Sequence, residues 1–357
     1  MKIVMFTPYY QPVIGGITNY TSHLTDSLRR RNNKVIVITR YGDNKSDVYA
    51  LNTNKLLFSL KSFIKLFNIK PDVIHSHGGW YTLLPGVMYK FFSPSTKLIQ
   101  SEHTQPESNM NRLTVVFVKF LYSHCDWLTY DSDITPDILS NYFTIPTKHK
   151  KIYGGAFVSK ITREDIEKYR QNFGLDDKDY APIIAYMGPF AWEMKAEGVK
   201  KLIMAFQYVL KKEPNSLLVI IGDGQYRKRT EDFANSLKLS KNIIFSGFVE
   251  KPHALLASCD IYAHISLMDS LPLSILESML LRLPVIATKV GDIPELITDN
   301  FNGILVDANE ISIANSILDL WHNPDKIEKI SKNGKELAEK KYSWDRISQI
   351  YLDIYNQ

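Results

Sequence analysis

The sequence has little cysteine and no long apolar run, and both scarcities narrow the class of protein. Its only cysteines, Cys125 and Cys259, fall in different halves of the chain and form no motif. They fit a reducing cytoplasm better than the disulfide framework of a secreted domain. No apolar window approaches ~20 residues, so we expect no transmembrane helix. The opening apolar run is broken at Pro8, too soon for a signal peptide.

Positive and negative charges are also nearly balanced. A net charge of +5 over 357 residues permits attraction to anionic lipids or phosphorylated ligands but gives no argument for nucleic acid. Hydrophobic residues make up 45% and charged residues 23%, which is ordinary for a folded soluble protein. At this length we expect two domains, each with its own core.

Strands and helices alternate from the beginning of the chain. Residues 3–7 form a buried strand, a loop with Gly15 and Gly16 follows, and a helix (17–31) precedes a second strand (34–39). This βαβ pattern predicts a parallel sheet whose ligand edge lies at the carboxyl ends of the strands. No Gly-x-Gly-x-x-Gly fingerprint follows the strand. The glycine pair either lets backbone approach a ligand or makes a plain turn.

An amphipathic helix is predicted over residues 54–67. Its apolar residues keep helical spacing, and Lys55, Lys61 and Lys65 occupy the remaining positions without any acidic residue. A basic helix of this kind can lie on a membrane surface, as peripheral proteins do, although covering a sheet is the more common arrangement. Both interpretations stay open.

Titratable side chains follow two later strands. His75 and His77 lie two residues apart, hence on one face of a strand, where they form either a metal pair or, more simply, one site imidazole at the strand tip. Asp131 and Asp133 match an Asp-x-Asp metal motif, but that spacing recurs by chance. We treat these two carboxylates as structural.

The pattern changes after residue 157. A charged helical stretch and a polar segment precede a new strand at residue 183, and alternation then resumes. We therefore predict a first domain over 1–157, a junction over 158–177 and a second domain over 178–342.

The most informative stretch is residues 264–279, which ends an apolar run and enters a helix. Ser270 suits an N-cap, and Pro272 is tolerated in a first turn. The N–H groups of Leu271, Leu273 and Ser274 would then point out of the helix end, unpaired. Such an end attracts anions, above all phosphate.

Two carboxylates flank this predicted phosphate site. Asp269 lies in the turn before the helix, and Glu277 shares the face of Leu273 and Ser274 one turn deeper. The arrangement suits sugar hydroxyls on either side of a diphosphate. A surface helix with an acidic first turn is the simpler alternative.

With these motifs in order, the chain resembles the retaining glycosyltransferases of family 4. The most specific part is Asp269-x7-Glu277 with the strand after it, and the resemblance covers nearly the whole length. It implies an α/β fold of the GT-B type, with two Rossmann-like parallel-sheet domains facing a cleft and a C-terminal helix (343–357) that crosses back to the first domain. The other matching pieces are Gly15-Gly16, residues 72–77, Gly222-Asp223-Gly224, Gly247-Phe248-Val249, Pro294-Glu295 and the Trp344 helix.

The resemblance also implies roles for particular residues. Glu277 would bind the donor ribose and Asp269 a hydroxyl of the donor sugar. Lys195, reaching from a loop, would pair with the diphosphate, and Val249 would meet the base through its backbone. His77 would lie beside the transferred sugar.

Further donor contacts are implied at the helix end and the glycine loop. Leu271, Leu273 and Ser274 would bind the phosphates, and Gly15 and Gly16 would let the first loop close over them. The donor would be a UDP- or GDP-linked sugar and the acceptor a glycan or lipid-linked molecule. No metal or other cofactor would be needed, because Lys195 and the helix end would meet the charge of the departing diphosphate. That phosphate would itself take the acceptor's proton, since the motif contains no obvious base. The enzyme would act in the cytoplasm, or at the inner face of the membrane through the basic helix Lys55–Phe67.

Two departures from the family pattern bear on activity. Gly188 is followed by Pro189 where the family has Arg, so Lys200, Lys201 or Arg227 would have to supply the missing cation. Asp269 replaces Glu, which shortens the carboxylate by one methylene. A nucleotide-sugar epimerase or a phosphorylase on the same fold, and a non-catalytic nucleotide-sugar-binding protein, remain as alternatives.

Overall fold

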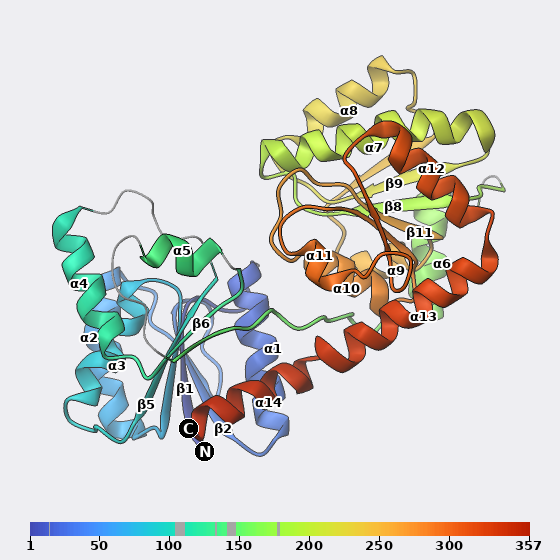
Figure 1. Cartoon of the computed structure of the whole chain (residues 1–357). Coiled ribbons are helices and arrows are strands. Elements are labelled where there is room, and N and C mark those ends of the chain that lie inside the picture. Colours follow the sequence, from blue (N-terminus) through green and yellow to red (C-terminus); the bar gives the residue numbers. More distant parts are fainter. Residues whose placement is uncertain (14, 104–110, 133, 141–147, 177–178) are drawn as a thin grey trace. The chain divides into compact units, whose positions relative to one another are not determined.

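The computed structural model describes residues 1–13, 15–103, 111–132, 134–140, 148–176 and 179–357, and the chain divides into two compact α/β units (Figure 1). The first unit comprises Met1–Gly155 and Trp344–Gln357, and the second comprises Ala156–Ser343. The last helix thus belongs to the first unit. The segment 158–177 belongs to the second.

The first unit is built on a seven-stranded sheet in which every described pair of neighbouring strands is parallel. Its strands, in spatial order, are β3 Val48–Ala50, β2 Lys34–Tyr41, β1 Lys2–Tyr9, β4 Val73–His77, β5 Lys97–Glu102, β6 Trp127–Tyr130 and β7 His149–Lys151. Continuous apolar runs such as that of β1 suit a sheet covered on both faces.

Helices cover both faces of this sheet. They are α1 Gly16–Arg30, α2 Lys55–Ile69, α3 Trp80–Lys90, α4 Arg112–Ser123, α5 Ile134–Ser140 and α14 Trp344–Tyr355. Helices α1 and α14 lie on one side, and α2, α3 and α4 lie on the other (Figure 1). Two cores result, one on each face.

Helix α14 is held to the first unit by polar as well as apolar contacts. The hydroxyls of Tyr20 and Tyr351 lie 2.8 Å apart, and those of Ser27 and Ser348 lie 2.9 Å apart. All four side chains are buried. These pairs fix how α14 packs on α1, because a buried hydroxyl that loses its partner costs free energy.

The second unit repeats the architecture with a six-stranded parallel sheet. Its strands, in spatial order, are β10 Ile243–Gly247, β9 Leu217–Ile221, β8 Ile183–Met187, β11 Ile261–His264, β12 Val285–Thr288 and β13 Ile304–Val306. Its helices are α6 Arg163–Asn172, α7 Glu193–Lys212, α8 Arg227–Ser236, α9 Pro252–Leu256, α10 Leu273–Leu280, α11 Ile293–Leu296, α12 Glu310–Trp321 and α13 Pro324–Lys341.

The predicted fold class, two parallel-sheet α/β domains, is confirmed. Some elements of the first unit were not predicted: the short strands β3 and β7, and the helices α3 and α5. Pro85 lies inside α3, and an internal proline argues against a helix when only the sequence is read.

Helix α2 differs from the prediction in the direction of its apolar stripe. The residues that face the sheet are Phe58, Ser59, Ser62 and Leu66. The apolar stripe instead points away from it, and the side chain of Leu56 is 70% exposed. Helix α2 therefore covers the sheet, but through the face that carries Ser59 and Ser62, whose small side chains allow a close approach, while most of the predicted apolar stripe stays exposed.

One buried carboxyl group makes the stability of the first unit depend on pH. Glu102 is 6% exposed and accepts hydrogen bonds from the Tyr122 hydroxyl and, at 2.7 Å, from Gln100 Nε2. Burial outweighs these bonds and raises the pKa of Glu102 from 4.5 to about 7. The folded state then binds a proton more tightly than the unfolded state, so stability falls as the pH rises from about 4.5 through 7.

We expect Glu102→Gln to remove most of this loss. At pH 8 the variant should be more stable by about 2 kcal/mol, somewhat less than the full shift allows, because its amide N–H groups need partners of their own. Chemical denaturation of both proteins at pH 5 and pH 8 measures the difference. If the free energy of unfolding changed with pH equally in both proteins, Glu102 would not be the source of the pH dependence.

Candidate active site

The carboxyl edge of the second sheet is formed by loops that pack closely on one another. Gly222 follows β9 with φ at 136°, and a Cβ there would lie 2.0 Å from the carbonyl oxygen of Gly188. Its N–H donates to the carbonyl of Gly247 at 3.1 Å. Only glycine fits this position, so the loops after β8, β9 and β10 form one ordered edge. Val249, which is 9% exposed, lies two residues after the end of β10.

Helix α10 begins two residues later than an N-cap at Ser270 requires. Its N-cap is Pro272, in extended conformation, and no side chain caps the helix. Ser270 instead accepts a hydrogen bond through its carbonyl from the Asp292 N–H at 3.3 Å. The predicted N-cap is therefore wrong, and Leu271 lies outside the helix. Leu273 and Ser274 do form its first turn, where N–H groups have no acceptor within the helix.

Asp269 lies at the centre of a buried ionic cluster in the second unit. Lys195 Nζ lies 3.1 Å from both of its carboxylate oxygens, and His264 Nε2 lies 2.8 Å from Oδ2. Burial alone would raise the pKa of Asp269, but the hydrogen bond from His264 and the charge of Lys195 lower it. The Asp269 side chain, 8% exposed, is thus held as a carboxylate.

The next layer of contacts orients His264. Its Nδ1 lies 3.1 Å from the hydroxyl of Tyr262, which donates to the carbonyl of Met187 at 3.1 Å. Burial raises the pKa of Tyr262, so this phenol stays protonated. The strand β11 supplies both rings because alternate residues share one face.

Lys195 reaches Asp269 from the first turn of α7, and the prediction that it comes from a loop is wrong. Helix α7 begins at Glu193. Gly198 permits a close approach of this helix to the end of β11, since a Cβ there would lie 2.4 Å from the carbonyl oxygen of Ile265. The cation is therefore carried on a rigid element.

The three candidates for the second diphosphate cation are not equivalent. Lys200 pairs with Glu197 at 2.7 Å and Lys201 with Glu310 at 3.7 Å. Arg227, at the start of α8, pairs with Asp223 at 3.3 Å, and its guanidinium lies 2.7 Å from the Cβ position of Gly247. Of the three, Arg227 lies against the loops of the carboxyl edge.

Glu277 has a partner that no sequence spacing indicates. His253 Nε2 lies 3.5 Å from Glu277 Oε2, and His253 Nδ1 accepts from the Ser159 N–H at 3.2 Å. With Nδ1 as an acceptor, the ring proton lies on Nε2 and faces Glu277. Ser159 and α9 thereby fix both the tautomer of His253 and the position of the carboxylate.

We expect His253→Ala to weaken ligand binding at Glu277 by about fivefold, because the carboxylate loses the imidazole that lies 3.5 Å away and orients it. The measurement is calorimetric titration with nucleotide sugars, the ligands that the family resemblance implies. In a Glu277→Ala background the same change should have little further effect. Equal losses in both backgrounds would mean that His253 acts on the fold alone.

The first unit carries a second group of candidate residues at the carboxyl edge of its sheet. His77 Nδ1 lies 2.9 Å from His103 Nε2, and His103 Nδ1 lies 3.4 Å from Asp131 Oδ2. With one proton per ring and Asp131 as acceptor, His77 Nε2 is left as an acceptor. It is buried without a hydrogen-bond partner among the described residues. Burial lowers the pKa of His77 well below 6.5, so the ring is neutral.

His75 has a different role from His77. Its Nδ1 lies 2.7 Å from the Tyr355 hydroxyl and its Nε2 lies 2.7 Å from the Ser101 hydroxyl. Both ring nitrogens are thus engaged in tying α14 to the sheet. Within the described residues, no group of three or more His, Cys, Asp or Glu side chains could hold a metal ion. Asp133 lies outside the described residues.

Gly15 and Gly16 lie where β1 leads into α1. Gly15 is the N-cap of the helix and Gly16 its first residue. Among the described residues, no atom lies within 4 Å of the Cβ position of either. Neither glycine is therefore needed for packing inside the first unit.

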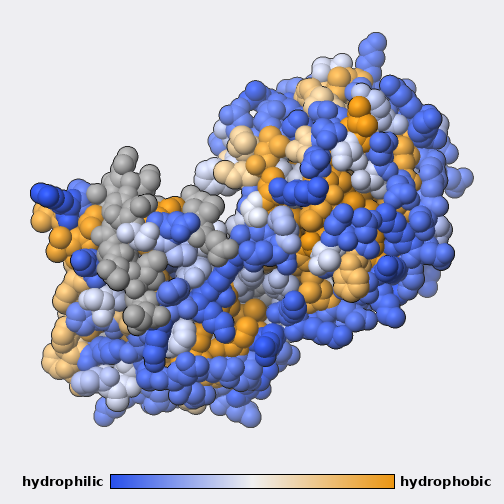
Figure 2. All heavy atoms as spheres, in the orientation of Figure 1, coloured by the Kyte–Doolittle hydropathy of each residue, from blue (hydrophilic) through white to orange (hydrophobic). Residues whose placement is uncertain are grey.

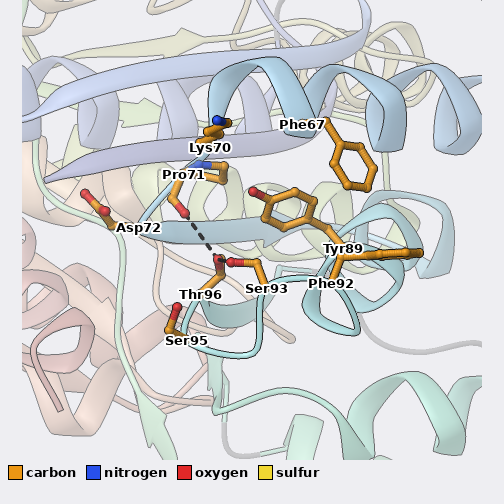
Figure 3. Close-up of a pocket in the computed structure, with 9 residues that line it drawn as sticks. All are labelled: Phe67, Lys70, Pro71, Asp72, Tyr89, Phe92, Ser93, Ser95 and Thr96. Atoms are coloured by element: carbon orange, nitrogen blue, oxygen red, sulfur yellow. Dashed lines mark hydrogen bonds between the residues drawn. The ribbon is translucent and has the colours of Figure 1, made fainter.

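A hollow of about 520 Å³ in the first unit is not part of these sites (Figure 3). Its lining includes Lys70, Asp72 and Thr96, which precede β4 and β5. It therefore opens at the amino ends of the strands, whereas His77 lies at a carboxyl end.

Comparison with known proteins identifies families for both units. Residues 14–156 match the model of Glycosyltransferase Family 4, and residues 165–337 match that of Glycosyl transferases group 1. Together these ranges span most of the chain.

Relatives and solved structures agree with both matches. An uncharacterised glycosyltransferase of Methanocaldococcus jannaschii is 28% identical, with 99% of this chain and 98% of that protein covered. Alpha-monoglucosyldiacylglycerol synthase of Streptococcus pneumoniae is 25% identical, with 99% and 86% covered. Anabaena HepE in complex with UDP has a TM-score of 0.78 at 20% identity, with both chains fully covered. The chain therefore belongs to the family 4 type of glycosyltransferases and is built on the GT-B fold.

Proposed function

We propose that the chain transfers a sugar from a UDP- or GDP-linked donor to a glycan or lipid-linked acceptor, with retention of configuration at the anomeric carbon. The observation that carries the proposal is the arrangement of Asp269, Lys195 and Glu277 around the first turn of α10. Solved HepE structures with UDP and with UDP-glucose support a nucleotide-sugar donor.

The donor would be held by complementary charge. The N–H groups of Leu273 and Ser274 and the cations of Lys195 and Arg227 would meet the diphosphate. Glu277 would accept hydrogen bonds from the ribose, and the backbone of Val249 would contact the base. The loop at Gly15 and Gly16 would close over the phosphates.

Lys195 would exchange part of its ion pair with Asp269 for contact with the diphosphate. Asp269 would then be free to accept a hydroxyl of the donor sugar while His264 still holds its other oxygen. Lys195 is the more exposed partner, at 18% against 8% for Asp269, so it is the side chain that a ligand would reach first.

Catalysis would rest on stabilising the departing diphosphate. As the glycosidic bond breaks, negative charge grows on that phosphate, where the helix end and Lys195 lower its energy. The departing phosphate would take the proton of the acceptor hydroxyl on the face where the new bond forms. A metal ion would not be required. His77 Nε2 would accept a hydrogen bond from a hydroxyl of the transferred sugar.

The acceptor would be a glycan or a lipid-linked molecule, used in polysaccharide, glycolipid or glycoprotein glycan synthesis. Relatives named as alpha-monoglucosyldiacylglycerol synthases favour a lipid among these. The enzyme would work in the cytoplasm or at the inner face of its membrane.

A donor screen tests the proposal. Thermal unfolding with a panel of UDP- and GDP-sugars should single out one donor, because a bound ligand raises the melting temperature. Release of the nucleotide with candidate acceptors, in the presence of a chelator, then measures turnover, and nuclear magnetic resonance of the product reads the anomeric configuration. Tight donor binding without turnover on any acceptor would support a non-catalytic binding protein instead. Loss of turnover in the chelator would overturn metal independence.

A further inference from the structure

Helix α2 exposes an apolar face to solvent. Phe58, Ser59, Ser62 and Leu66 face the sheet, whereas residues about half a turn away are apolar and open. The exposed fractions are 70% for Leu56, 51% for Leu60 and 56% for Ile64. Large exposed apolar patches mark surfaces that contact another protein or a membrane.

Helix α4 repeats the pattern in the same layer. Val118, Leu121 and Tyr122 pack into the core under the helix. On its opposite side Leu113 is 84% exposed and Val116 is 66% exposed. Since α2 and α4 cover one face of the sheet, their open sides both point away from it.

Helix α3 contacts α4 at its start, through Trp80, and the segment just after its end contacts α2, through Phe92. Trp80 packs on Phe117 of α4, and the rings of Phe67 in α2 and Phe92 lie 5.5 Å apart. Phe92 is 69% exposed. Figure 2 shows hydrophobic atoms along the outer edge of this unit, where Figure 1 labels α2, α3 and α4. The open sides of these elements form one outer apolar surface.

Charge of one sign borders the outer apolar surface. Neither α2 nor α4 contains an acidic residue. Lys61 and Lys65 flank the open stripe of α2, and Arg112 and Lys119 flank that of α4. Lys61 and Lys119 pair with no carboxylate among the described residues. An apolar centre with a cationic border matches an anionic lipid surface.

We propose that the outer apolar surface binds the face of a membrane rich in anionic lipids. The leucine and phenylalanine side chains would enter the boundary between headgroups and acyl chains, and the lysines would meet lipid phosphates. The first unit would bind in this way whatever sugar the enzyme transfers. Within the described residues, we find no helix whose length and hydropathy would let it span a bilayer, so the contact would be peripheral.

A second copy of the chain fits this surface less well. A symmetric contact brings the same patch of each copy together, so Lys61, Lys65 and Lys119 would face their own counterparts. Like charges at the border of an interface repel, whereas lipid phosphates attract them.

The hollow in Figure 3 adjoins this surface. Phe67 and Phe92 belong to its lining, as do Lys70 and the hydroxyls of Ser93 and Ser95. The hollow thus places apolar rings beside a cation and hydroxyls, as a lipid places its acyl chains beside its polar headgroup.

Co-sedimentation with vesicles tests the proposal on the full chain. We expect binding to phosphatidylcholine vesicles that contain phosphatidylglycerol, weaker binding to phosphatidylcholine alone, and release by high salt. Replacing Leu56, Leu60 and Ile64 together by Gln should reduce partitioning at least about tenfold. Lys61→Glu should reduce it about fivefold or more.

Matched controls lie on the second unit. Ile311→Gln and Lys241→Glu change an exposed apolar and an exposed basic residue there, and both should bind vesicles like the parent. Unchanged melting temperature and donor affinity in the α2 variants would separate membrane contact from folding and from the donor site. Absence of vesicle binding would overturn the proposal. So would dimerisation, measured by analytical ultracentrifugation, that the Gln variant abolishes.

Discussion

Replacing Glu277 with Ala is expected to weaken the affinity for the nucleotide-sugar donor by about one hundredfold. The carboxylate lies one turn inside α10 and is oriented by His253 at 3.5 Å. The proposed hydrogen bonds to the ribose are charge-assisted, and their loss leaves two hydroxyls without partners. Isothermal titration calorimetry with the donor found in the screen measures the effect.

Two further variants make the Glu277 result specific. Glu328→Ala removes an exposed carboxylate of the same unit, 64% exposed, and should leave donor affinity unchanged. Glu277→Gln keeps the shape but removes the charge, so it should fall between the parent and the Ala variant. An unaltered donor affinity in Glu277→Ala would refute the ribose contact.

Replacing His77 with Ala is expected to reduce kcat by about one hundredfold while the donor dissociation constant changes less than about threefold. The reason is that His77 Nε2, an acceptor without a partner among the described residues, would contact the sugar as its bond to phosphate breaks. Steady-state kinetics and donor titration together give the two numbers.

Because His77 is buried, control variants must separate an effect on folding from an effect on catalysis. His124→Ala removes a histidine from α4's end in the same unit and should leave both constants unchanged. His103→Ala removes the ring that orients His77 and should lower kcat by a smaller factor, about tenfold, without lowering donor affinity. Equal losses of kcat and donor affinity in His77→Ala, with a lower melting temperature, would assign a purely structural role to the ring.

The fold class was predictable because it rests on local patterns. Apolar runs bounded by glycine and proline predict buried parallel strands, and the alternation of strands with helices predicts the sheets. The terminal helix was predicted over 343–357 and spans Trp344–Tyr355, and its apolar periodicity explains why its bounds agree within two residues.

The candidate site was predictable only where one segment contains it. Asp269 and Glu277 lie in one turn and the helix that follows it, so their spacing in the sequence is enough to predict that they flank the same helix end. His253 and Lys195 reach those carboxylates from other elements, and no local pattern indicates such long-range contacts. His264 lies in the same stretch, five residues before Asp269, but its contact was not predicted. The predicted start of the helix was wrong because of a contact with another segment. Ser270 suits an N-cap by type, but its backbone is committed to Asp292.

The direction of the apolar stripe on α2 could not be read from periodicity either. Helical spacing gathers apolar residues on one side but does not tell which side meets the sheet. Ser59 and Ser62 decide this, because their small side chains allow a close approach. They are buried, while Leu56 and Leu60 are not.

Hydrogen–deuterium exchange with and without the donor tests the central claim most directly. If the start of α10 binds the diphosphate, the amides of Leu273 and Ser274, together with the loop after β10, must exchange more slowly when the donor is bound. A control peptide from α12 should show no change. Donor binding that leaves exchange at Leu273 and Ser274 unaltered would contradict the account.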